Sequence, residues 1–166
     1  MRWIFAAVML MSSGLAHADD VVLAPEDFLR EAFPEKPPLV QSLWLDDAIQ
    51  ARLKPILEHS YPAARLRYWR IQNRTAWILE DVGKEFPITA GFVVNDGAIE
   101  TARVLIYRES RGDEIRYPRF LKQFSGARLR DGELAQDIDG ISGATLSVAA
   151  MKRMARAALL LTSLVK

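Results

Sequence analysis

The sequence predicts an α+β fold: a small antiparallel sheet with N-terminal helices and a long C-terminal helix packed against it. The middle of the chain is rich in aromatic and β-branched residues separated by turn residues, which is typical of β-hairpins. The two flanks show helical periodicity instead. With 166 residues, half of them hydrophobic and 26% charged, the chain has the size and composition of one folded domain.

The N-terminus has the pattern of a secretory signal. Arg2 precedes the apolar run 3–11, and Ala16-x-Ala18 follows as a cleavage site. The run is too short to serve as a permanent membrane span. We therefore expect export to the periplasm, with cleavage near Ala18.

The amino-acid composition argues against several classes of function. Cleavage would remove Arg2 and no acid, which leaves as many basic as acidic residues and argues against nucleic-acid binding. The chain has no cysteine, and His59 is the only histidine after the signal. Thiolate metal sites are excluded, and histidine-based metal or haem sites are disfavoured. A redox function would therefore need an organic cofactor.

Two helices are expected in the segment 19–60, which we interpret as a helical cover for the sheet. The first begins at Pro25, a favoured first helical residue, and stops before Pro34. The second begins at Asp46 or Asp47, and Pro55 is expected to kink or divide it. The main domain is expected over 61–166.

Two hairpins are expected next. Strands at 65–72 and 75–82 flank a turn at Asn73 and Arg74. The second hairpin, 88–107, turns at Asn95-Asp96-Gly97, which accept the left-handed backbone of tight turns.

The second arm of that hairpin alternates in polarity. Ala102, Val104 and Ile106 fall on one face, which we expect to be buried. A loop with Gly112 follows, and then a short helix that ends at Gly126.

The last helix is expected from about residue 143 to 164. Lys152, Arg153 and Arg156 share one of its faces, while small and apolar residues line much of the other. The apolar run near its end is too short to span a membrane, so a buried helix end is expected.

The stretch "DIDGISGATLS" lies where this helix begins. If Ser142 is the N-cap, Gly143, Ala144 and Thr145 form the first turn, whose free N–H groups suit a phosphate. Small side chains would admit a ligand, and Thr145 offers a hydroxyl. The alternative is a plain helix cap with small residues for packing. A hydrolase elbow does not fit, because Ala144 replaces its last glycine.

The same run resembles the flavinylation motif Asp-x-x-(Ser/Thr)-Gly-Ala-Thr of the FMN-binding domain family. That family includes the C subunit of sodium-pumping NADH:quinone reductase, the G subunit of the Rnf complex and the nitrous-oxide regulator. The preceding hairpin, the loop 109–112 and "FLKQFSG" at 120–126 agree in order and spacing, from roughly 86 to 162. The resemblance implies that 61–166 is an FMN-binding domain.

The resemblance also implies the cofactor and its attachment. FMN would be joined through its phosphate to Thr145, with Asp139, Ser142, Gly143 and Ala144 completing the motif. A magnesium-dependent flavin transferase would make this bond by splitting FAD and releasing AMP. The resemblance implies no catalytic or metal-ligating residue in this chain.

The ring contacts are less specific. The family loop often reads Glu-Thr-Pro-Gly-x-Gly, whereas residues 109–114 lack the proline and the second glycine. Gly112 and Tyr107 are nevertheless expected to contact the flavin. Tyr117 and Phe120 are further stacking candidates, with plain core packing as the alternative for all three aromatics. Lys122, Arg128 and Arg130 could bias the reduced flavin, with a solvated face as the alternative.

The resemblance therefore implies a periplasmic electron carrier. Its electron donor would be a membrane-bound reductase or a cytochrome. Two alternatives stay open. One is a flavin-dependent reductase of a soluble substrate, with Tyr107 or a carboxylate of 109–114 as proton donor. The other is a non-redox binding or assembly module.

Overall fold

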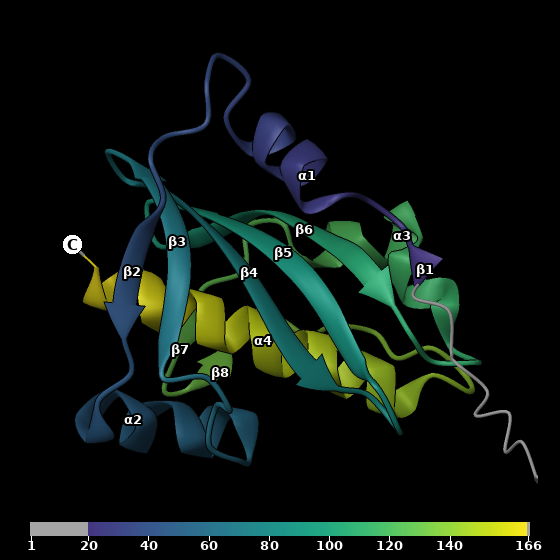
Figure 1. Ribbon diagram of the computed structural model, residues 1–166. Helices are drawn as coiled ribbons and strands as arrows, with labels where there is room; N and C mark the ends of the chain where they lie inside the picture. The colour runs from purple at the N-terminus through teal and green to yellow at the C-terminus, as the bar shows by residue number, and fades with distance from the viewer. Residues whose placement is uncertain (1–19, 166) are drawn as a thin grey trace, which may run out of the picture.

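The structure is a computed structural model that describes residues 20–165; the expected signal peptide and its cleavage site lie outside them. These residues form a six-stranded antiparallel sheet, ordered β1-β6-β5-β4-β3-β2, with helices on both faces (Figure 1). The predicted α+β fold is confirmed. The elements, in chain order, are β1 (Asp20–Val21), α1 (Pro25–Ala32), β2 (Gln41–Trp44), α2 (Asp47–Leu57), β3 (Arg65–Ile71), β4 (Arg74–Val82), β5 (Pro87–Asn95), β6 (Ala98–Tyr107), η1 (Asp113–Arg116), α3 (Pro118–Leu121), η2 (Lys122–Phe124), β7 (Leu129–Arg130), β8 (Glu133–Leu134) and α4 (Thr145–Leu164).

The long C-terminal helix α4 crosses one face of the sheet and makes the main core with it (Figure 1). Trp77 and Met151 are fully buried there, and the Trp77 indole N–H donates to Thr162 Oγ1 at 2.9 Å. The apolar end of α4, including Leu160 and Leu161, is buried in this core, as expected. No helix within residues 20–165 combines the length and apolar character needed to cross a membrane.

Helix α1 covers the opposite face and begins at Pro25, as predicted. Its Phe28 is fully buried against the sheet, together with Val93 and Leu105. Gly91 leaves the room for this ring, since a Cβ at that position would lie 2.7 Å from Phe28 Cζ. Both faces of the sheet are therefore covered around its centre.

Helix α2 begins one residue after Asp46, whose carboxylate accepts from the Ile49 N–H at 2.8 Å. Of the two expected effects of Pro55, a kink or a division of the helix, the division does not occur, because the helix runs through Pro55 to Leu57. Pro55 lies in the last turn of α2. Because it has no N–H, one backbone hydrogen bond is lost there, but few helical hydrogen bonds follow that position.

The N-cap at Asp46 leads to a prediction about stability. Replacing Asp46 by alanine is expected to cost about 1 kcal/mol, because the Ile49 N–H loses its acceptor. Asp47→Ala, one residue further on, removes a carboxylate that makes no cap bond and is the matched control. Urea unfolding of the two variants measures the difference; equal losses would contradict the cap's role.

The first hairpin differs from its prediction by one residue. Ile71 pairs with Arg74, so the turn is Gln72-Asn73 and Arg74 already belongs to β4. Gln72 takes the left-handed conformation, with φ of 52°. The second hairpin is as predicted at Asp96 and Gly97, which both have positive φ.

The alternation along β6 is broken by a bulge. Ala90 pairs with Val104 and Thr89 with Ile106, so Leu105 is the extra residue. Ile106 therefore packs on the α1 side with Leu105, and its predicted place beside Ala102 and Val104 is wrong.

The segment 20–60 does more than supply helices. Its strand β1 pairs with β6 at one edge of the sheet, and β2 pairs with β3 at the other. These two strands were not predicted, because they have only two and four residues.

Candidate functional site

The start of α4 is built differently from its prediction. The helix begins at Thr145 and its N-cap is Ala144, with no side-chain cap bond, so the prediction of Ser142 as N-cap is wrong. Gly143 has φ of 83°, and the Ala144 N–H donates to Ile141 O at 3.0 Å. This turn separates the exposed Ser142 from the helix and leaves Thr145 exposed as its first residue.

A hollow of about 650 Å³, here called the α4 hollow, opens beside this helix start. The β4–β5 loop, the loop after β6 and the first turn of α4 surround it. It is lined by Lys84, Glu85, Glu109, Ser110, Arg111, Gly143, Ala144, Thr145, Leu146 and Ser147. Its volume is in the range of small-molecule sites. Gly143, Ala144 and Thr145 thus all line this hollow.

The small residues of the motif have local structural reasons. A Cβ on Gly143 would meet nothing within 4 Å, so its glycine serves the left-handed backbone rather than space. Ala144 is 3% exposed, and its Cβ would lie 3.0 Å from a Cβ added to Gly112. Ala144 and Gly112 are therefore small because the 109–112 loop packs closely on the helix start.

The buried side chain of Tyr107 contacts the loop 109–112. Its hydroxyl donates to Arg111 O and lies 3.3 Å from Ser147 Oγ. Burial raises the pKa of Tyr107, which keeps its hydroxyl protonated as a donor. Tyr107 is 3% exposed and does not line the α4 hollow, so it supports the wall and is not placed to contact a ligand there. Gly112 is buried behind the lining in the same way.

Glu109 joins the two loops of the hollow. Its Oε1 accepts the backbone N–H groups of residues 84, 85 and 86 at 2.5 to 3.0 Å. Partial burial acts to raise the pKa of Glu109, but these three hydrogen bonds outweigh it and hold the pKa below its usual value. The carboxylate therefore fixes the β4–β5 loop against the loop after β6.

The hydrogen bonds of Glu109 predict that the free energy of unfolding decreases at acid pH. Because the pKa of Glu109 is lower in the folded state, its contribution is present above about pH 4.5 and is lost as the pH falls through the folded pKa. Glu109→Gln should therefore show a weaker loss of stability on acidification than the unchanged protein. Thermal unfolding over this range measures it, with Glu114→Gln as the matched control. Parallel curves for all three proteins would contradict the role of Glu109.

The other predicted residues are elsewhere. Asp139 lies with Tyr117 and Phe120 along a smaller hollow of about 290 Å³, and its N–H donates to Gln123 Oε1 at 2.7 Å. Asp139 and Ser142 do not line the α4 hollow. The same holds for the predicted cations Lys122, Arg128 and Arg130; Arg128 donates to Asp96 O at 2.9 Å.

Three charged residues of the lining, Lys84, Glu85 and Arg111, were missed as candidates. Arg111 belongs to the loop after β6, whereas Lys84 and Glu85 belong to the short loop between β4 and β5, and only the fold brings that loop beside α4. Nothing in the local sequence distinguishes them from ordinary exposed loop residues.

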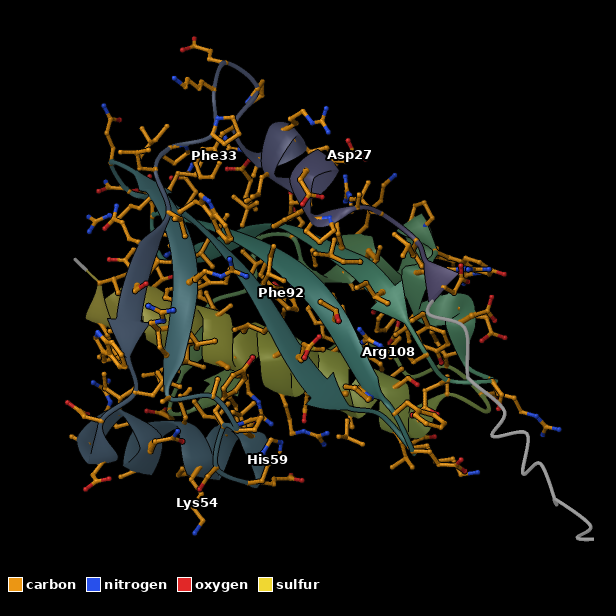
Figure 2. All side chains as sticks on the ribbon, viewed as in Figure 1. Asp27, Phe33, Lys54, His59, Phe92 and Arg108 are labelled. Carbon is orange, nitrogen blue, oxygen red and sulfur yellow. The ribbon has the colours of Figure 1, made fainter. Side chains whose placement is uncertain are left out.

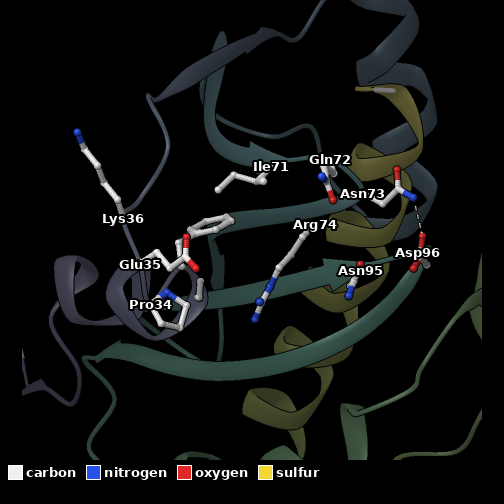
Figure 3. A pocket seen from close by; sticks show the side chains of 11 residues that line it. Pro34, Glu35, Lys36, Ile71, Gln72, Asn73, Arg74, Asn95 and Asp96 are labelled. Carbon is white, nitrogen blue, oxygen red and sulfur yellow. Dashed lines mark hydrogen bonds between the residues drawn. The ribbon is translucent and has the colours of Figure 1, made fainter.

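A second large hollow, about 590 Å³, lies between the end of α1 and the turns of both hairpins (Figure 3). Some of its polar side chains are engaged: Asn73 Nδ2 donates to Asp96 Oδ1 at 2.8 Å, and Arg74 pairs with Glu100 outside the lining. It shares no lining residue with the α4 hollow. Within residues 20–165, no group of three or more histidine, aspartate or glutamate side chains is arranged to hold a metal ion.

Comparison with known proteins bears on the choice between the two hollows. Residues 83–160 match the model of a family described as the FMN-binding domain. Every residue that lines the α4 hollow lies within this range, whereas most of the lining of the second hollow lies outside it. No curated protein matches the chain.

Proposed function

The chain belongs to the FMN-binding domain family through residues 83–160, and from this premise we propose that it is an exported electron carrier. It binds FMN as a family member, and we assign the attachment point to Thr145. One observation carries this assignment: Thr145 is the first residue of α4, is exposed, and lines the α4 hollow.

The residues of the hollow fit a flavin phosphate. The first N–H groups of α4 have no intrahelical partners, and the helix dipole adds a stabilisation of about 0.3–1 kcal/mol for an anion there. Lys84 and Arg111 also line the hollow and offer positive charge, and of the two acids in the lining Glu109 is engaged by three N–H groups and Glu85 pairs with Lys84 at 3.4 Å. A phosphoester with one negative charge therefore suits this place.

The attachment reaction needs an exposed hydroxyl. The oxygen of Thr145 would form a bond to the flavin-side phosphorus of FAD, while the pyrophosphate bond would break, AMP would leave, and the hydroxyl proton would be released. A magnesium-dependent flavin transferase is the partner for this step. A covalent bond retains the cofactor where a helix terminus alone is too weak to do so.

The bound FMN supplies the electron transfer, and the protein supplies binding, orientation and tuning. We propose that the signal-like N-terminus directs the protein to the periplasm. A membrane-bound reductase or cytochrome would then donate the electrons.

The alternative of a self-sufficient flavin reductase has less support. Two of its candidate proton donors are already engaged: the Tyr107 hydroxyl with Arg111 O and Ser147, and the Glu109 carboxylate with the 84–86 loop. The other two, Asp113 and Glu114, do not line the α4 hollow. A reductase needs such a group free to reach its substrate.

The test is expression with and without an active flavin transferase, followed by intact mass and visible spectra. We expect a mass gain of one FMN less one water, and a flavin that is reduced and reoxidised without turnover of a soluble substrate. An unmodified mass, with a transferase shown to modify another target, would overturn the proposal. Steady turnover by the purified protein alone would favour the reductase.

A further inference from the structure

His59 lies just beyond α2, after Glu58, which ends that helix in a left-handed conformation. In Figure 2 it is labelled near the C-terminal end of α2. Its Nε2 is 2.8 Å from Asp81 Oδ1, and its Nδ1 is 2.9 Å from the carbonyl oxygen of Ser60. Neither contact belongs to the α4 hollow or to the proposed attachment of FMN.

Asp81 is a buried carboxylate, with 1% of its side chain exposed. Its Oδ2 accepts from Arg153 Nε at 2.6 Å, and its Oδ1 accepts from the Val82 N–H at 2.9 Å. Because both of its oxygens already accept hydrogen bonds, this carboxylate acts as an acceptor only. Its contact with His59 is therefore one in which the His59 Nε2–H donates. A buried charge with three donors around it is well paired.

The partners of His59 therefore decide its protonation. A backbone carbonyl and an ionised carboxylate are both acceptors only, whereas a neutral imidazole has one donor and one acceptor nitrogen. Both ring nitrogens of His59 must carry protons for both contacts to be hydrogen bonds. The geometry is that of an imidazolium, and a neutral ring would lose one of the two bonds.

The cluster also reaches the α4 hollow. Arg153 Nη2 donates to Val82 O at 3.1 Å, and Val82 is the last residue of β4. The chain then enters the loop 83–86, whose Lys84 and Glu85 line the hollow. His59, Asp81 and Arg153 thus join the end of α2, the end of β4 and the helix that begins at Thr145.

We propose that His59, Asp81 and Arg153 form a proton-dependent clasp that positions the loop 83–86 at the α4 hollow. Only the identification of that hollow as the flavin site rests on the proposed function. The charges that face His59 are Asp81 from β4, Arg153 from α4 and the neighbouring Glu58, whose carboxylate is 3.7 Å from Arg153 Nη1. Glu80 turns to the other side of β4, where it meets Thr89 and Arg108.

The direction of the pH dependence follows from the contacts. The hydrogen bond to Ser60 O, and then that to Asp81, raise the pKa of His59 above 6.5, against partial burial and the charge of Arg153. For a raised histidine pKa, the stabilisation is complete below about pH 6.5 and is lost as the pH rises through the folded pKa. The clasp therefore loosens toward alkaline pH.

The test is an NMR titration of the full chain before flavin attachment. The chain has two histidines, so His59→Gln identifies the His59 signals by their loss. We expect His59 to have both nitrogens protonated at slightly acid pH, with a pKa above the ordinary value that falls in Asp81→Asn. The amide signals of residues 82–84 should shift with the same midpoint and stay flat in His59→Gln.

A neutral His59 at slightly acid pH would overturn the proposal, and so would amide signals of 82–84 that do not follow His59. If Asp81→Asn fails to fold, the comparison with His59→Gln alone decides both points. After flavin attachment, the flavin fluorescence should change with the same midpoint and lose that change in His59→Gln. Because the first titration needs no flavin, failure of attachment would contradict the proposed function and leave the clasp standing.

Discussion

Replacing Thr145 by valine is expected to abolish covalent flavin attachment, so that the intact mass after expression with an active transferase equals that of the unmodified chain. Valine keeps the shape of threonine and removes only the hydroxyl that would form the phosphoester. Thr145 is exposed at the first position of α4 and makes no cap bond. The stability should therefore change by no more than about 0.5 kcal/mol.

Two controls sharpen this result. Thr145→Ser keeps a hydroxyl at the same place and should keep the added mass. Ser142→Ala changes a motif residue that is exposed and does not cap the helix, so its stability should be unaffected. Its attachment rate then reports recognition by the transferase alone. A full mass gain in Thr145→Val would place the attachment elsewhere and remove the main support for the assignment.

The parts of the fold that the sequence predicts are those with strong local signals. Pro25 marks the start of α1, and Asp96-Gly97 marks the turn of the second hairpin, because each residue favours the backbone conformation found there. The edge strands β1 and β2 lack such a signal. They are short and mostly exposed, and only their pairing with β6 and β3 defines them.

The bulge at Leu105 shows a second kind of limit. Periodicity places Ile106 with Ala102 and Val104, but one extra residue in β6 moves it to the opposite face. That shift depends on how Thr89 and Ala90 of the neighbouring strand are paired. A single strand's sequence does not contain this information.

In the candidate site, too, some features could be predicted from the sequence and others could not. Gly143, Ala144 and Thr145 line one hollow, but the prediction that all three form the first helical turn is wrong, because only Thr145 belongs to α4. That prediction mistakes Ser142 for the cap, because serine is a common cap while the left-handed Gly143 here moves the helix start two residues on. Tyr107 is a supporting residue because its hydroxyl meets Arg111 and Ser147, which only the fold brings together.

Replacing Gly112 by valine should be the most damaging substitution in the support of the α4 hollow, with a loss of about 2–6 kcal/mol in the free energy of unfolding. Gly112 has φ of 86°, a conformation that costs a β-branched residue about 1–3 kcal/mol. A Cβ there would also lie 3.0 Å from Ala144 Cβ, 3.1 Å from the Tyr107 hydroxyl and 3.3 Å from Ser147 Oγ. Overpacking of this kind adds about 1–3 kcal/mol.

Gly126→Val separates these two causes. Gly126 has nearly the same φ, 80°, but a Cβ there would meet nothing within 4 Å, so only the backbone strain applies. Urea unfolding should rank Gly112→Val well below Gly126→Val in stability, and only the former should slow flavin attachment at Thr145. Slowed attachment is expected because the loop 109–112 must move away from the helix start when the side chain is added. Equal losses in both variants, with attachment unchanged, would show that the contact of Gly112 with Ala144 does not hold the wall of the hollow.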